Sequence, residues 1–290
     1  MAFSDANPFA YRDNHNGQAV WTYKILSVLT WLLSVASSIY YTYGIPGDDK
    51  KEWRNTIWGQ NSRFPTPFSL NAIIASLYWL ALFLFQIAYL WHLFSKSTEK
   101  VQAAAGVGSH FIFNNLLQFA FVMLFVRGHF VIAEIILIIN FFNLSSLYFR
   151  HATHPRLIHI GAVSGPLAWS FVALYWNGAI MVNAHSFPAR LLANIAIWGI
   201  LVYGWFFLVI YKDYTMGFAL SILTASLGVH QFFIKAIALQ WIFAFTIMAT
   251  LFVTTLLIAI PGIFGKEISF RREQDVVPAD QERAPLLDDH

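Results

Sequence analysis

Long apolar runs with almost no charged residues are the feature of this sequence that most restricts its fold. In hydrocarbon a backbone must satisfy its own hydrogen bonds, and a run of about 20 apolar residues does so as a spanning helix. Thr66-Pro67 has the pattern of an N-cap followed by proline at the first helical position, so the second helix is expected to begin there. The expected spans are approximately 21–43, 68–94, 107–126, 130–149, 157–182, 189–211, 214–232 and 237–260. We therefore predict an all-α, polytopic transmembrane helical bundle of about eight helices.

The composition agrees with a lipid environment. Of the 290 residues, 58% are hydrophobic and 11% are charged, whereas a soluble domain has roughly a quarter of its residues charged. The mean hydropathy of +0.56 points the same way. The net charge of +3 is not gathered into a basic stripe, so nucleic acid is not an expected partner. The expected partner of most of the chain is the lipid bilayer.

The distribution of charge predicts the orientation and the domain organisation. Lys and Arg are more frequent in the segments that share a side with the two termini, which favours both termini in the cytosol. The first long loop, 44–66, is also basic and argues the other way. We predict a cytosolic N-terminal tail at 1–20, a transmembrane domain at 21–262 and a disordered cytosolic C-terminal tail at 263–290.

The C-terminal tail contains a sequence typical of a sorting signal. Glu282 precedes Leu286-Leu287 in the pattern of an acidic dileucine signal. In such signals two leucines enter an apolar pocket of a clathrin or vesicle adaptor while the carboxylate meets a basic patch. This interpretation predicts a vacuolar or endosomal membrane. The alternative is a chance pair of leucines in a disordered tail.

The N-terminal tail contains a second short motif, Asn7-Pro8-Phe9. Its Asn and Pro favour a turn that projects the Phe into a pocket of an endocytic adaptor domain. The alternative is an ordinary turn before the first helix. Both motifs act only in the cytosol, which is the side predicted for both tails.

Glu134 is the only carboxylate inside the predicted spans. A charged side chain at membrane depth costs about 2.5–3.5 kcal/mol or more, so Glu134 is a candidate functional residue. Arg127 precedes it by close to two helical turns and is expected on the same face. One interpretation is a proton or cation site whose charge changes during transport. The other is a structural group satisfied by a His or Asn on a neighbouring helix.

A polar stripe marks the third predicted span. His110, Asn114 and Gln118 recur at a spacing of four residues, which places them on one helix face that must point into the bundle. Asn140 and Asn143 repeat the pattern more weakly on the fourth span. These groups either line a path for a solute or form interhelical hydrogen bonds worth about 0.6 kcal/mol each.

Several chemical functions have no residues to support them. The chain has no cysteine, which excludes thiolate metal sites and a Cys nucleophile. Most of its histidines fall near the predicted helix ends, and no HExxH, P-loop, nucleophile-elbow or Rossmann glycine pattern is present. We therefore predict no catalytic residues, no metal site and no cofactor.

Three Asn-containing segments carry a resemblance to a known family. They are GSHFIFNNLLQ at 108–118, INFFNLSSLYFRH at 139–151 and YWNG at 175–178. The chain resembles a fungal family of multi-pass membrane proteins of unknown function. The resemblance implies a fungal endomembrane protein similar to that family from the first to the eighth helix, with both tails outside. It implies no particular catalytic or binding residues.

Two classes of function remain open. The first is a transporter or channel-like protein for a small solute or ion. The second is a non-catalytic membrane scaffold or an assembly or trafficking factor, in which the same polar groups hold helices together. A water-accessible cavity that reaches Glu134 would favour the first class, and a dry, packed bundle would favour the second.

Overall fold

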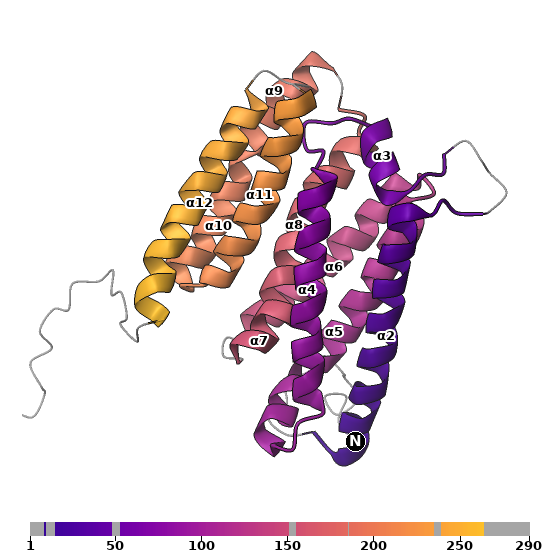
Figure 1. The fold of residues 1–290 in the computed structure, drawn as a ribbon, viewed down its shortest axis with the longest axis vertical. Coiled ribbons are helices and arrows are strands. Elements are labelled where there is room, and N and C mark those ends of the chain that lie inside the picture. Colours follow the sequence, from indigo (N-terminus) through magenta and orange to yellow (C-terminus); the bar gives the residue numbers. More distant parts are fainter. Residues whose placement is uncertain are drawn as a thin grey trace, which may run out of the picture.

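The protein is helical throughout the part of the chain that the structure describes. The structure is a computed structural model. It describes residues 9, 15–47, 53–150, 155–184, 186–234 and 239–263. Within these ranges eight helical segments are long and apolar enough to cross a membrane. Figure 1 shows them side by side, with their axes roughly aligned. The predicted all-α bundle of about eight spans is confirmed.

The spans follow one another up and down through the bundle. Because the number of spans is even, the first span starts and the last span ends at the same end of the bundle (Figure 1). We call this end the terminal face and the opposite end the loop face. The spans are α2 (Gly17–Tyr43), α4 (Ala72–Leu93), α5 (Thr98–Phe125), α6 (Phe130–Arg150), α7 (Arg156–Ile158) with η1 (His159–Ser164) and α8 (Gly165–Met181), α9 (Phe187–Ala196) with α10 (Trp198–Ile210), α11 (Tyr214–Ile234) and α12 (Gln240–Ile263). The short helix α3 (Ile57–Arg63) lies at the loop face between α2 and α4.

The second span begins later than the sequence predicts. Thr66 does not cap it: its backbone N–H donates to Ser69 Oγ at 2.8 Å, and its carbonyl accepts from the Ser69 N–H at 3.2 Å, closing a turn. Asn71 is the N-cap, and its side chain accepts from two backbone N–H groups of the first turn of α4. Hydroxyl side chains compete with helix formation in this way, and Asn is a strong N-cap residue.

Small side chains bring the first span close to α5. The buried face of α2 consists largely of Ser and Thr, including Ser27, Thr30 and Ser34. On α5, a Cβ added at Gly108 would lie 2.9 Å from the Tyr23 ring, so that ring packs directly on the α5 backbone. Small residues permit this close approach, which replaces hydrophobic burial as the source of packing energy in lipid.

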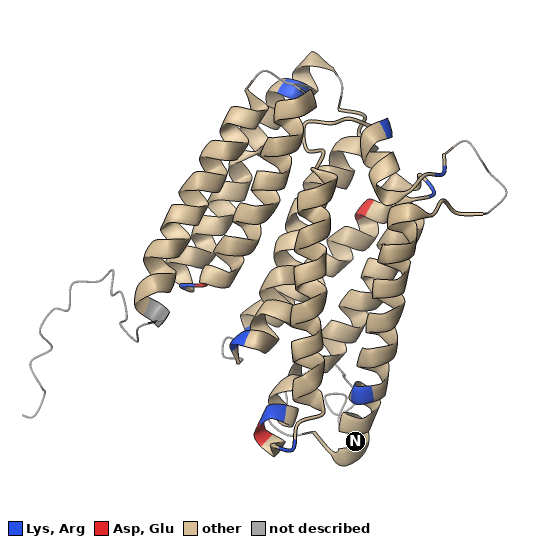
Figure 2. Ribbon diagram, viewed as in Figure 1, with Lys and Arg blue, Asp and Glu red and all other residues tan. Residues whose placement is uncertain are grey.

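The outer surface is suited to a bilayer. Large apolar side chains such as Leu29, Leu84, Val202 and Leu257 are exposed. Figure 2 shows most charged residues near the two ends of the bundle, with a largely uncharged band between them. An exposed apolar band bounded by charge is the surface of an integral membrane protein.

At the loop face, side chains of the last two spans hold the segment that precedes α4. Gln231 of α11 donates from Nε2 to the Thr66 carbonyl at 2.8 Å, and Gln240 of α12 donates from Nε2 to the Pro67 carbonyl at 3.2 Å. Each glutamine lies more than 160 residues from the carbonyl that it contacts. These bonds tie α11 and α12 to the N-terminal part of the bundle.

The π-helix η1 packs against α4 without a side chain between them. A Cβ at Gly161 would lie 2.6 Å from the carbonyl oxygen of Phe85, which is backbone and cannot move aside. We therefore expect Gly161→Ala to lower the free energy of unfolding by about 1–3 kcal/mol. Gly106→Ala on α5 is the matched control, because nothing lies within 4 Å of its added Cβ.

Thermal unfolding of the detergent-solubilised protein, followed by tryptophan fluorescence, compares the two variants. Gly106→Ala should unfold at or slightly above the wild-type temperature, since alanine is the better helix former by roughly 0.5–1 kcal/mol. Equal stability of Gly161→Ala and the wild type would show that η1 and α4 are not in backbone contact.

Candidate functional site

The polar stripe lies on α5 and faces the interior of the bundle. His110, Asn114 and Gln118 are each only 4% exposed. Their spacing places them one turn apart, about 6 Å along the helix axis. Polar side chains of α6 meet the stripe at two levels, and a third polar level joins α6 to α8 nearer the loop face.

The level nearest the terminal face joins His110 to Asn143 of α6. The His110 Nδ1 lies 2.8 Å from Asn143 Oδ1, and Asn143 Nδ2 donates to the backbone carbonyl of His110 at 3.2 Å. The carbonyl can only accept, which fixes the orientation of the Asn143 amide and makes His110 Nδ1 a donor. The other ring nitrogen, Nε2, is buried and has no hydrogen-bond partner among the described residues.

The middle level joins three helices through Asn140 of α6. Its Nδ2 donates to Asn114 Oδ1 of α5 at 3.0 Å and to Ser170 Oγ of α8 at 3.3 Å. Asn140 is 2% exposed. Its Oδ1 has no partner within the described part of the chain. The Asn114, Asn140 and Ser170 side chains therefore form one connected group with one unused acceptor.

The level nearest the loop face contains Glu134 of α6. Asn177 of α8 donates from Nδ2 to Glu134 Oε2 at 2.7 Å and to the Phe130 carbonyl at 2.9 Å. The Phe130 carbonyl can only accept, so the identity of Nδ2 is fixed and Oδ1 is the remaining acceptor. This Oδ1 is buried and has no partner in the described ranges. A Cβ at Gly178 would lie 3.2 Å from Glu134 Oε1, so the carboxylate rests against the α8 backbone.

We call this set of residues the polar column. It runs along the interface of α5, α6 and α8, and each of its three levels keeps one buried, unpaired polar atom. Leaving such an atom unpaired costs about 1–3 kcal/mol. Its members are His110, Asn114, Gln118, Glu134, Asn140, Asn143, Ser170 and Asn177.

Arg127 is not part of the helix that contains Glu134, so the expected common helix face does not apply. Arg127 lies in the turn between α5 and α6, where Gly128 has a φ of +77°, and α6 begins only at Phe130. Helical spacing therefore does not apply to this pair. The Arg127 guanidinium donates to the Met123 carbonyl at 2.9 Å and lies 5.8 Å from the centroid of the Tyr41 ring on α2.

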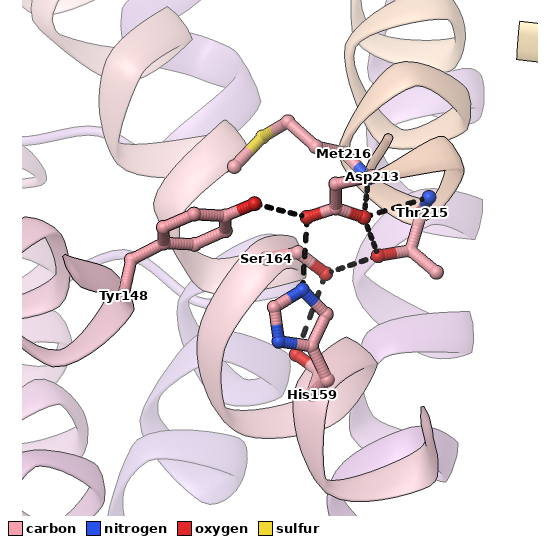
Figure 3. A network of polar contacts seen from close by, with 6 residues as sticks. All are labelled: Tyr148, His159, Ser164, Asp213, Thr215 and Met216. Carbon is pink, nitrogen blue, oxygen red and sulfur yellow. Dashed lines mark hydrogen bonds and ion pairs between the residues drawn. The ribbon is translucent and has the colours of Figure 1, made fainter. Parts of the chain in front are cut away.

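The structure contains a second polar cluster that sequence analysis missed. Asp213 lies between α10 and α11 at the terminal face and is only 8% exposed. Figure 3 shows its carboxylate at the centre of the cluster. Oδ2 accepts from the Tyr148 hydroxyl at 2.9 Å and from His159 Nε2 at 2.8 Å. Oδ1 accepts from the Thr215 hydroxyl at 2.5 Å and from the backbone N–H groups of Thr215 and Met216 at 2.9 and 3.1 Å.

These contacts make Asp213 the N-cap of α11 and a link between three parts of the chain. Tyr148 comes from α6, and His159 opens the π-helix η1. Ser164, at the end of η1, places its hydroxyl 2.8 Å from the Thr215 hydroxyl. Lys212, just before Asp213, has a φ of +52° and turns the chain into the cap. A π-helical turn alters where its side chains point, and here it directs His159 at the carboxylate.

Electrostatics favours the charged form of Asp213, which lies outside the spanning segments. Burial alone would raise the pKa of Asp213, but the hydrogen bond and charge of His159, with the bonds from Thr215 and Met216, hold the pKa below its ordinary value. Five donors already occupy the two oxygens. The cluster is therefore built for stability rather than for binding. Among the described residues, no three His, Asp or Glu side chains are grouped as a metal site requires.

The sorting motifs fall largely outside the described residues. Phe9 is the exception: its ring meets the His110 ring edge to face at a centroid distance of 5.1 Å and the Phe113 ring at 5.9 Å. Arg150 donates to the Phe9 carbonyl at 3.2 Å. In this structure Phe9 therefore packs on the bundle rather than projecting into solvent. The motif residues outside the described ranges are Asn7, Pro8, Glu282, Leu286 and Leu287.

Replacement of Asp213 by Asn tests the cluster. Loss of charge-assisted hydrogen bonds should lower the free energy of unfolding by about 1.5–3 kcal/mol near neutral pH. Because the folded-state pKa is depressed, the contribution of Asp213 is present above its ordinary pKa of about 3.9 and is lost as pH falls through the folded-state value. The wild type should therefore lose stability below about pH 4, and Asp213→Asn should lack that component.

Unfolding temperatures across a pH series, measured in detergent, give both effects. Glu99→Gln is the control, because Glu99 is exposed in the first turn of α5. An Asp213→Asn variant with wild-type stability and the same acid dependence would rule out the assigned role of the cluster.

Comparison with known proteins agrees with the family suggested by the sequence. Residues 190–287 match the model of a family described as "Fungal protein of unknown function (DUF1774)". The match begins within α9, includes α10 to α12 and extends into the C-terminal tail, so it differs in extent from the expected resemblance. Neither the comparison with curated proteins nor that with solved structures gives a match. The last third of the chain is thus similar to this fungal family of unknown function.

Proposed function

We propose that the protein carries a small solute or ion across a vacuolar or endosomal membrane along the polar column. The observation that supports this function is the unpaired polar atom at each of the three levels of the column. Bonds made only to hold helices together would gain nothing from these atoms, since an unpaired buried acceptor is destabilising. Water or a transported species that passes along the column would satisfy them in turn.

The column has a useful length for this role. From Asn143 to Glu134 along α6 it covers about 13 Å at a rise of 1.5 Å per residue, roughly half of the hydrocarbon thickness of about 30 Å. Asn140 lies between the two residues, and Gln118 lies on α5 one turn beyond Asn114, toward the loop face. Polar groups inside a spanning bundle typically mark solute and ion pathways.

Glu134→Gln tests the function directly. The amide keeps the size of the side chain and removes its charge, so a transported species that interacts with the carboxylate should cross about tenfold more slowly, since one such interaction is worth roughly 1.5–3 kcal/mol. The measurement is solute and ion flux into proteoliposomes that contain the full chain. Glu99→Gln is the control, because Glu99 lies at the exposed start of α5. Identical fluxes for Glu134→Gln and wild type would remove Glu134 from the pathway.

The vacuolar or endosomal location is a separate part of the proposal. It is supported by the spacing of Glu282 and the Leu286-Leu287 pair. Leu286→Ala with Leu287→Ala removes both side chains that an adaptor pocket would hold. We expect the fluorescently tagged double variant to be lost from the vacuolar or endosomal membrane. Microscopy of living cells measures its location. A double variant that keeps the location of the wild type would show that another signal directs sorting.

One observation favours a second function, that of a non-catalytic membrane scaffold or assembly factor. The bonds of the column all join helices: Asn143 joins α6 to α5, Asn140 joins α6 to α5 and α8, and Asn177 joins α8 to α6. In a scaffold these bonds alone would be the purpose of the column. Because the chain has no cysteine, a single Cys at Asn114 would report water access by reaction with a polar thiol reagent. Labelling favours transport, and protection favours the scaffold.

A further inference from the structure

We infer that the species carried by the polar column is a cation: a proton, a small monovalent metal ion or a protonated amine. This inference rests on the proposed function and specifies its substrate class. It comes from the chemical type of the atoms that the column leaves unpaired, which are His110 Nε2, Asn140 Oδ1 and Asn177 Oδ1. All three are acceptors of hydrogen bonds in the arrangement that the structure describes.

The acceptor character of two of these atoms is fixed by their neighbours. Asn177 turns its NH2 group to the Glu134 carboxylate and to the Phe130 carbonyl, and a backbone carbonyl cannot donate. Its free atom must therefore be the carbonyl oxygen. Asn143 likewise turns its NH2 to the His110 carbonyl, so its oxygen faces His110 Nδ1, and in the neutral ring the free Nε2 carries a lone pair.

The unpaired atom of the middle level is also an acceptor. Asn140 donates through both hydrogens of Nδ2, to Asn114 and to Ser170, and keeps its carbonyl oxygen unpaired. With Glu134 at the loop-face end, the column presents lone pairs and a carboxylate along its length. The three unpaired acceptors and the carboxylate attract positive charge and groups that donate hydrogen bonds.

The burial of these groups strengthens the preference of the column for cations. His110 is 4% exposed, Asn140 is 2% exposed and Asn177 is fully buried. With little bulk water around them, their dipoles act on a passing ion at a low local dielectric. Carbonyl and amide oxygens replace the hydration shell of monovalent cations in this way in selective pores. An anion would find no N–H or O–H group left to receive it at the three unpaired positions.

Proteoliposomes that contain the full chain test the inference with five probes. Potassium, methylammonium and a proton gradient read by an internal pH dye represent the cation class, and chloride and glycerol represent anions and neutral solutes. We expect flux of at least one cation probe and none of chloride or glycerol. Asn140→Leu removes the unpaired acceptor of the middle level, and we expect it to lower the cation flux about tenfold.

Asn115→Leu is the matched control. Asn115 is a buried asparagine, as Asn140 is, but it lies on α5. Its Nδ2 donates to the Phe111 carbonyl of its own helix at 2.9 Å, outside the column. It should keep the wild-type flux. Chloride or glycerol flux that Asn140→Leu lowers would overturn the cation inference and leave the proposed function standing. Absence of flux for all five probes would contradict the proposed function itself.

Binding of a cation to the wild-type protein gives a second readout besides flux. In detergent, potassium or methylammonium should raise the unfolding temperature of the wild type by about 2–4 °C over N-methylglucamine at equal ionic strength, because a bound cation stabilises the folded state. Asn140→Leu should lose this shift. No shift with either cation, together with no proton flux, would overturn the inference.

Discussion

Hydrocarbon offers no hydrogen-bond partner to a polar side chain, and this constraint determines where the polar groups of the bundle lie. Apolar side chains such as Leu84 and Val202 face outward, whereas His110, Asn114 and Asn140 are buried inside the bundle. Asn140, Asn143 and Asn177 each obtain a partner from a neighbouring helix. The interface of α5, α6 and α8 is therefore specified by polar contacts as much as by packing.

The same constraint explains how the last helices are held. At the terminal face, the Asp213 carboxylate accepts from Tyr148 and His159, which belong to α6 and η1. At the loop face, Gln231 and Gln240 donate to backbone carbonyls of the segment before α4. In both places one side chain satisfies groups that would otherwise be buried unpaired, so the attachment is directional. Apolar contacts alone would fix the helices far less specifically, since lipid competes for them equally well.

Much of the fold follows from properties that a linear sequence displays directly. Apolar runs show the spans, and a spacing of four residues shows that His110 and Asn114 share an inward face. The position of Arg127 was not accessible in this way, because a turn with Gly128 at positive φ interrupts the helical spacing. Asp213 was missed because its partners are distant in sequence, and between two spans it resembles an ordinary loop residue. Only the Asp213-Tyr-Thr pattern, typical of an N-cap, hinted at its role.

What a sequence cannot display at all is which atom of a buried amide remains unpaired. An asparagine carries both a donor and an acceptor, so the letters at 140 and 177 are compatible with a path for anions or for cations. The fold removes this ambiguity by placing the donors of Asn177 against a carboxylate and a backbone carbonyl. The same bonds that hold the helices together thereby set the polarity of the interior. The amide N–H groups of the column are occupied by bonds to its own helices. The structural role of the column and its proposed transport role are therefore linked.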